Sequence, residues 1–98
     1  MIHRFVKMNF RPEEITQFKA VFEASKQHIA AFPGCMGLKL IQDITQKNIL
    51  YTYSIWGQES DLEAYRSSEL FKSTWAQTKV LFAEKAQAWS THVVDHVK

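Results

Sequence analysis

The segment Ile49–Trp56 constrains the fold most, because its pattern is that of a β-strand with large apolar side chains on both faces. Successive side chains of a strand point to opposite sides. One side of this strand would carry Ile49, Tyr51, Tyr53 and Ile55, and the other would carry Leu50, Thr52, Ser54 and Trp56. A strand that is apolar on both faces is typical of the middle of a sheet that is covered on both sides. We therefore expect Ile49–Trp56 to be a central strand.

The first half of the chain predicts two more strands and a long helix. Residues 1–10 and 35–44 alternate apolar with polar side chains, which favours strands, although Arg4 and Phe5 interrupt the first alternation. In residues 15–32, apolar side chains recur at spacings of three and four. That spacing gives a helix one apolar stripe, and the proline and glycine that follow would end it.

The second half predicts a broken helix and a last strand. Polar residues 45–48 form a break of hairpin length before the central strand. Ser60 and Glu63 have the spacing of a capping box, which would start a short helix. The serines at 67–68 would cap or kink the chain before a longer helical segment. Residues 88–97 then predict a final strand.

The order strand, helix, strand, strand, helix, strand predicts one α+β domain over residues 1–98. Right-handed crossovers arrange these elements as a ferredoxin-like, four-stranded antiparallel sheet with both helices on one face. The helices cover only one side, so the other apolar side of the central strand would be exposed. We expect a second copy to cover it, sheet against sheet, in a two-fold homodimer. A long loop could also cover it, but the chain has no spare segment for this.

Composition and cysteine content argue against several classes of function. Twelve basic and ten acidic residues give a net charge of +2, which predicts neither a nucleic-acid nor a membrane partner. Cys35 is the single cysteine, so neither an intrachain disulfide nor a cysteine-based metal site is possible. His92 and His96 would lie about 13 Å apart on the final strand, too far to ligate one ion. We expect no metal, and the alternating first residues, unlike a signal peptide, favour a cytoplasmic protein.

Aromatic residues form the remaining candidate site. Trp56 would end the central strand, Tyr65 the short helix, and Phe71 and Trp75 lie one turn apart on the longer helix. If the helices stand off the sheet, these rings would wall a pocket for a flat apolar molecule. Spacing alone favours the alternative, a filled aromatic core. Arg66, near the mouth of such a pocket, could hold a phenolate or a carboxylate.

Several segments resemble the antibiotic biosynthesis monooxygenase family. The run Phe32–Leu38 is similar to the helix-to-strand signature of these domains. Tyr53–Trp56, Asp61–Arg66 and the pair Leu70-Phe71 resemble their third strand and second helix. The resemblance extends over nearly the whole chain and implies a dimeric α+β barrel. The fold hosts several functions, so it specifies the activity less strongly.

The resemblance implies an oxygenase that uses neither metal nor flavin. Some members oxygenate phenolic polycycles or quinols, because the deprotonated substrate itself passes an electron to dioxygen. Trp56 matches the tryptophan of this group, while Thr52 stands where the group has an asparagine. On this basis the catalytic candidates are Trp56 and Trp75, and Thr52, Tyr65, Arg66 and Phe71 are candidates for binding a small aromatic substrate.

The family also implies two alternatives. Members that degrade haem hold the iron with a histidine on the second helix, but residues 60–85 contain none, and Trp75 stands at the corresponding position. Tryptophan does not ligate iron, so haem degradation is disfavoured. A non-catalytic protein that binds an aromatic molecule or a porphyrin in the same pocket is the second alternative. Thr52 in place of asparagine and the lack of an evident base favour this binding protein.

Overall fold

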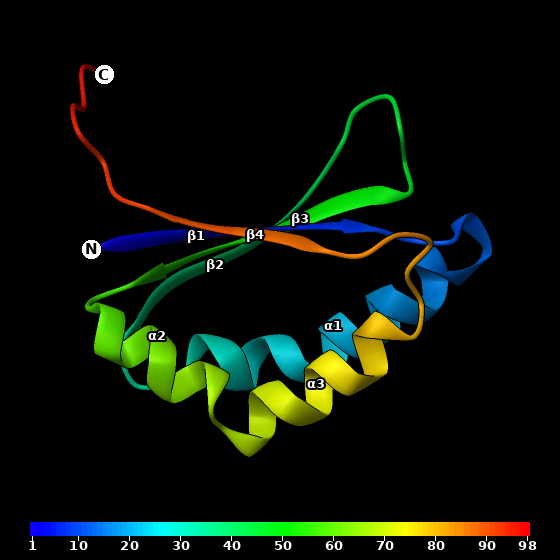
Figure 1. Cartoon of the computed structure of the whole chain (residues 1–98), viewed down its shortest axis with the longest axis horizontal. Coiled ribbons are helices and arrows are strands. Elements are labelled where there is room, and N and C mark those ends of the chain that lie inside the picture. Colours follow the sequence, from blue (N-terminus) through cyan, green and yellow to red (C-terminus); the bar gives the residue numbers. More distant parts are fainter.

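A four-stranded antiparallel sheet packs on a layer of helices in the computed structural model, which describes residues 1–98 (Figure 1). The elements follow the order β1 (Ile2–Asn9), the short 3-10 helix η1 (Pro12–Glu14), α1 (Ile15–Ala30), β2 (Cys35–Gln42), β3 (Ile49–Trp56), α2 (Glu59–Arg66), α3 (Glu69–Lys79) and β4 (Gln87–Thr91). The sheet order β2-β3-β1-β4 confirms the predicted ferredoxin-like α+β arrangement. None of the helices combines the length and the apolar composition needed to span a membrane.

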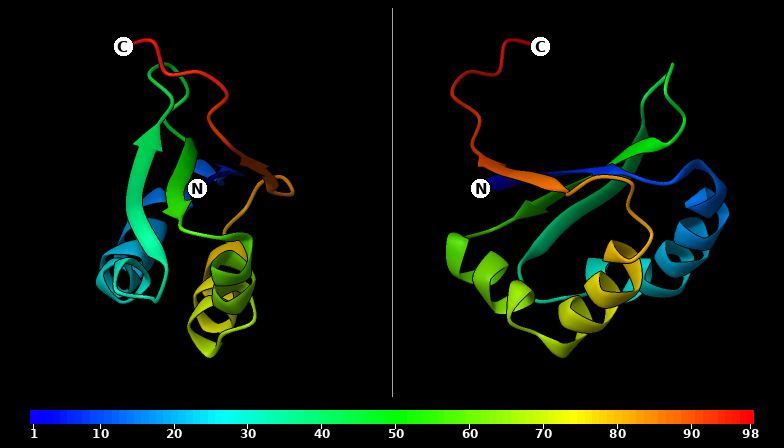
Figure 2. Two further views of the ribbon diagram at one scale, coloured as in Figure 1. Left: turned by 90° about the vertical axis from the view of Figure 1, so that its left-hand side faces the viewer. Right: turned by 45° about the vertical axis from the view of Figure 1, so that its right-hand side comes forward.

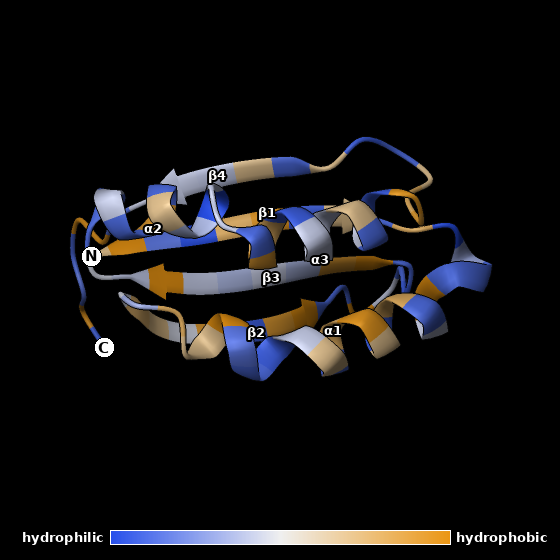
Figure 3. Cartoon of the chain, turned by 90° about the horizontal axis from the view of Figure 1, so that it is seen from below, coloured by the Kyte–Doolittle hydropathy of each residue, from blue (hydrophilic) through white to orange (hydrophobic).

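Strand β3 occupies the predicted central position, between β1 and β2. Its Thr52 lies opposite Val6 of β1 and Leu40 of β2. The helices lie on a single side of the sheet, with α1 below β2 and with α2 and α3 below β1 and β4 (Figures 2 and 3). One face of β3 therefore meets the helices, and the other, which we call the open face, has no cover within the chain.

The interruption at Arg4 and Phe5 is not a break in the geometry of β1. Arg4 pairs with Ser54 of β3, and Phe5 pairs with Tyr53. The pairing puts Arg4 on the helix-facing side of the sheet and Phe5 on the open face. Strand β1 is thus regular, but its helix-facing side carries an arginine where an apolar residue was expected.

The start of α2 differs from the predicted capping box. The Asp61 carboxylate accepts a hydrogen bond of 3.1 Å from the Gln58 backbone N–H, so Ser60 and Glu63 are not the capping pair. The helix begins at Glu59, because β3 runs to Trp56 and leaves just two residues for the turn. The predicted break before the second segment is confirmed, since Ser68 Oγ accepts a 3.1 Å hydrogen bond from the Phe71 N–H and caps α3.

The last strand is shorter than predicted. Strand β4 ends at Thr91, not near residue 97, and Thr91 lies opposite His3. Beyond this pair β1 has almost no residues left to bond with, so the chain leaves the sheet. Residues 92–98 then rise on the side opposite to the helices (Figures 1 and 2). His92 and His96 consequently do not share a strand face.

The tightly packed core fills one end of the space between the sheet and the helices. Met8, Phe10, Phe18, Leu50 and Leu81 form its buried cluster. The rings of Phe10 and Phe18 stack with centroids 4.3 Å apart. Trp56, at the far end of β3, is 0% exposed and closes the other end. The middle of β3 lies between these two packed ends.

Candidate functional site

A cavity of about 320 Å³ lies between the sheet and the helices. Its floor is made by short side chains, Thr52 and Ser54 on β3 and Ala88 on β4. These residues lie between the bulky Leu50 and Trp56 along the sheet. The floor is therefore low between two ends that large side chains fill. Fourteen of the 22 lining residues are hydrophobic. This is the composition of a site for a small, mainly apolar molecule.

The six candidate residues all line this one cavity. They are Thr52, Trp56, Tyr65, Arg66, Phe71 and Trp75. They come from β3, α2 and α3, which are brought together because α2 and α3 fold back under the sheet. The structure thus gathers the six residues at one place, and their roles remain predictions.

A row of aromatic rings forms one wall of the cavity. Trp56 stacks on Tyr65 with centroids 4.8 Å apart and an interplanar angle of 23°. Tyr65 meets Phe71 edge to face at 5.3 Å. Phe71 in turn stacks on Trp75 at 5.9 Å and 10°. Offset stacks and edge contacts are favourable geometries for aromatic pairs, so this wall is held in place by its own packing.

Trp56 serves this wall as a core residue. Its indole Nε1 donates a hydrogen bond of 3.0 Å to Ser54 Oγ. The side chain is fully buried, and its donor is already used within the chain. Trp56 is therefore packed as expected for a filled aromatic core. It would shape a ligand site without donating a hydrogen bond to the ligand.

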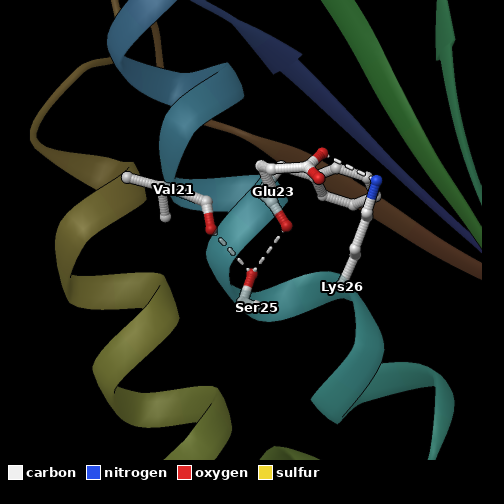
Figure 4. A network of polar contacts seen from close by, with 5 residues as sticks. Val21, Glu23, Ser25 and Lys26 are labelled. Atoms are coloured by element: carbon white, nitrogen blue, oxygen red, sulfur yellow. Dashed lines mark hydrogen bonds and ion pairs between the residues drawn. The ribbon is translucent and has the colours of Figure 1, made fainter.

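Two other hydroxyls beside the cavity are also satisfied internally. Ser25 Oγ donates to the Val21 carbonyl at 2.9 Å, within α1 (Figure 4). Thr78 Oγ1 donates to the Thr74 carbonyl at 2.8 Å, within α3. Hydroxyls bonded in this way to the preceding turn do not need a ligand.

Polar side chains that make no hydrogen bond within the chain also belong to the lining: Thr52, Tyr65, Thr74, Trp75 and Gln87. No buried side-chain nitrogen or oxygen lacks a hydrogen-bond partner. The Thr52 and Tyr65 hydroxyls and the Trp75 indole N–H are therefore not fully buried. They can donate hydrogen bonds to a bound molecule.

Tyr65 is a donor and not a base. Burial and, to a smaller extent, the neighbouring Cys35 raise the pKa of its hydroxyl to about 12. The hydroxyl is therefore protonated at neutral pH. It can stabilise a negative oxygen on a ligand, but it cannot accept a proton from one.

Arg4 also lines the cavity, and the sequence did not identify it as a site residue. Its Nη1 donates to Ser90 Oγ of β4 at 3.0 Å. Burial lowers the pKa of the Arg4 guanidinium, nearby Arg66 lowers this pKa further, and Glu63 opposes both effects. The sequence does contain a signal for Arg4, which is the interrupted alternation of β1. A charged residue at an apolar position of a strand points into the space between the sheet and the helices.

The cavity contains no side chain suited to remove a proton at neutral pH. Arg4, Arg66 and Tyr65 are its only titratable residues, and histidine, lysine, cysteine, aspartate and glutamate are absent from the lining. His3 lies on the open face, where Nδ1 and the Tyr53 hydroxyl are 2.6 Å apart. No three His, Cys, Asp or Glu side chains come together as a metal site. The lining therefore offers hydrogen-bond donors and two guanidinium groups, but no carboxylate, imidazole, thiol or amine.

Comparison with protein families gives one match. Residues 1–77 match the family described as antibiotic biosynthesis monooxygenase. This segment includes β1 to α2 and most of α3, and so it contains all six candidate residues. No curated protein matches the sequence.

Solved structures resemble the fold over nearly the whole chain. An antibiotic biosynthesis monooxygenase superposes with a TM-score of 0.90 over 97% of this chain and 100% of its own, at 14% identity. A conserved protein from Methanosarcina mazei gives 0.88 over 92% and 89%, at 18% identity. The protein Rv0793 from Mycobacterium tuberculosis gives 0.88 over 99% and 98%, at 16% identity. At these identities the likeness is one of fold.

Proposed function

The chain belongs to the antibiotic biosynthesis monooxygenase family, and from this membership we propose that it is a cofactor-independent monooxygenase acting on a small phenolic or quinol-like aromatic molecule. The substrate would bind in the cavity between the sheet and the helices. The observation that carries the proposal is that an aromatic wall and residues with unpaired hydrogen-bond donors, among them Thr52, Tyr65 and Trp75, line one largely apolar volume. The size of this volume, about 320 Å³, is at the low end for ligand pockets, about 300–1,000 Å³. It favours a molecule of one or two rings.

The proposed chemistry uses the substrate as the source of electrons. The deprotonated phenol or quinol transfers one electron to dioxygen, and the resulting radical pair combines to form a carbon–oxygen bond. One oxygen atom then stays on the substrate, and the other leaves as water with two hydrogen atoms of the substrate. The protein would exclude bulk water with its aromatic wall and stabilise the negative oxygen with Thr52, Tyr65 and Trp75.

Oxygen uptake by purified, metal-free protein tests this proposal. A panel of hydroquinones and anthrones, including 1,4-dihydroxynaphthalene, should consume dioxygen faster with protein than without it. Trp75→Phe keeps an aromatic side chain and removes the N–H, so uptake should fall about 100-fold or more, the order expected for one donor to an oxyanion. Ser73→Ala, on the exposed face of the same helix, is the matched control and should leave uptake unchanged. If no compound gives uptake above background, the oxygenase proposal is wrong.

A non-catalytic binding protein is the second candidate, and the absence of a base in the cavity lining favours it. In that case the same compounds should quench tryptophan fluorescence without consuming dioxygen. The volume favours a one- or two-ring aromatic over a porphyrin. Titration with hemin should accordingly give no Soret shift of the kind produced by a histidine ligand.

We also propose that two copies pair through their open faces as a homodimer. Phe5 and Tyr53 stack on this face with centroids 4.6 Å apart and planes nearly parallel, and His3 also stacks on Tyr53, at 5.8 Å. Trp89, opposite Phe5 on β4, is 46% exposed. A flat aromatic surface of this kind is typical of an interface. Residues 92–98 rise on the same side of the sheet (Figure 2), where they could contact a second copy.

A further inference from the structure

Arg4 is a charged side chain in the cavity that has no carboxylate partner. The other charged lining residue, Arg66, forms an ion pair with Glu63 at 3.1 Å. The remaining ion pairs of the chain, Arg11–Glu14 and Lys26–Glu23, do not involve Arg4 either. Placing a guanidinium between a sheet and a helix layer costs hydration free energy unless an anion compensates it. No carboxylate of the chain forms an ion pair with Arg4, and Glu63 acts on it only from a greater distance.

The position of Arg4 suits an anion that belongs to a ligand. Ser90 Oγ accepts one hydrogen bond from Nη1, which orients the guanidinium and leaves most of its five N–H donors free. Arg4, Leu62 and Arg66 also line a second, more polar depression of about 290 Å³. Arg4 therefore lies where the apolar cavity opens into a polar one, as the charged end of an aromatic ligand would require.

The aromatic cavity itself is lined by two cations, Arg4 and Arg66, and by no anion. Arg66 and Glu63 form an ion pair. Glu59 and Glu63 line the polar depression and not the aromatic cavity. Arg66 is solvent-exposed and already engaged, so it is a weaker anchor than Arg4. Arg4 is therefore the cation of the aromatic cavity that has no ion-pair partner.

We propose that Arg4 binds the carboxylate of an aromatic acid whose ring lies in the cavity against Phe71 and Trp75. The inference rests on the proposed function, because it specifies the ligand of the same cavity. A guanidinium matches a carboxylate with two parallel hydrogen bonds. A carboxyl group is ionised at neutral pH, whereas a simple phenol, with a pKa of about 10, is not. A permanently charged arginine thus selects the acid.

A matched pair of two-ring probes tests this inference. 2-Naphthoate and the neutral 2-naphthamide have the same ring and nearly the same shape, so they differ in charge. Tryptophan quenching and calorimetry should give naphthoate an affinity about tenfold or more above that of the amide, as expected for charge-assisted hydrogen bonds. Added salt should reduce this preference. Arg4→Gln should abolish it, and Arg4→Lys should retain part of it. Arg11→Gln, at an exposed arginine outside the cavity, should retain all of it.

Three outcomes would overturn the inference. Equal affinities in the unaltered protein would show that the site does not recognise an anion, even where hydroquinones still drive oxygen uptake; the proposed function would then stand alone. A preference for naphthoate that survives in Arg4→Gln would place the anion elsewhere. Binding of neither probe would remove the proposed aromatic-acid site, and oxygen uptake with the hydroquinones would then decide the proposed function separately. If Arg4→Gln fails to fold, the probe pair and its salt dependence in the unaltered protein decide the question.

Discussion

At the scale of single residues, the burial of Tyr65 in the cavity wall makes the stability of the fold depend on pH. Its pKa in the folded protein is about 12, against an ordinary value of 10, so folding favours the protonated hydroxyl. The resulting stabilisation is fully present below pH 10 and is lost as the pH rises toward 12. Its upper bound is about 3 kcal/mol. Tyr65→Phe keeps the ring stacked on Trp56 and cannot titrate. Urea unfolding over this range should therefore show a smaller loss of stability in the variant, and parallel curves for the two proteins would contradict the assignment.

Ser54 is a second residue with a specific role, because it satisfies the buried Trp56 indole at 3.0 Å. Ser54→Ala would leave a fully buried N–H without an acceptor, and this costs about 1–3 kcal/mol. The free energy of unfolding, measured with urea, should fall by that amount. Ser73→Ala removes an exposed serine hydroxyl from α3 and should change stability by less than about 0.5 kcal/mol. Equal effects of the two substitutions would mean that the indole finds another partner.

Sequence reasoning found the site residues that follow a spacing rule and missed the one that breaks it. Phe71 and Trp75 lie one turn apart on the same helix, so their shared direction could be predicted. Arg4 interrupts an apolar alternation, and from the pattern alone such a residue looks like an error in the strand. Its direction became clear from its register against Ser54, which depends on strand pairing between segments far apart in the sequence.

At the scale of elements, the turn between α1 and β2 is tied to the start of α2. Gly34 has a φ of +87°, and a Cβ on it would overlap the Asp61 side chain. The same Asp61 carboxylate caps α2 through the Gln58 N–H. Gly34→Ala should therefore add backbone strain and displace the cap. Each effect costs about 1 kcal/mol, so the free energy of unfolding should fall by about 2 kcal/mol or more.

A double-mutant cycle separates the two effects. Gly34→Ala in an Asp61→Ala background no longer meets the carboxylate, so the two substitutions together should cost less than the sum of the single ones. Gly37→Ala is the matched control, because its Cβ would lie 3.4 Å from Ile55, an ordinary contact, and its φ is not positive. Strict additivity would show that Gly34 and Asp61 do not interact.

The bounds of an element could be predicted where they depend on the residues within and beside it, and not where they depend on a partner strand. Strand β3 has the predicted bounds, Ile49–Trp56, because both of its faces and its flanking turns are marked in the sequence. Strand β4 ends at Thr91, six residues before the predicted end. Val93 and Val97 would share a strand face with Trp89, but no partner strand is left beside residues 92–97, and pairing is not a local property.

At the scale of the whole molecule, the proposed dimer depends on the open face. Phe5, Tyr53 and Trp89 form an aromatic surface there, which soluble monomers seldom leave uncovered. We expect the protein to sediment as a dimer at micromolar concentration. Phe5→Asp would place a carboxylate in the centre of the interface, where burial without a partner is unfavourable. The variant should sediment as a monomer, while its circular dichroism shows whether the fold is retained.

Two further variants show whether the loss of the dimer follows from position or from charge. Trp89→Lys alters the same face at an exposed residue of an edge strand, so it should weaken the dimer with little effect on folding. Val80→Asp introduces a charge at the end of α3, in the helix layer, where the side chain is 64% exposed; it should leave the dimer intact. A monomeric unaltered protein at this concentration would contradict the assembly, and so would dissociation by Val80→Asp.

Because the cavity lies on the other side of the sheet, 2-naphthoate should still bind to the monomeric Phe5→Asp variant, which separates the test of assembly from the test of the site.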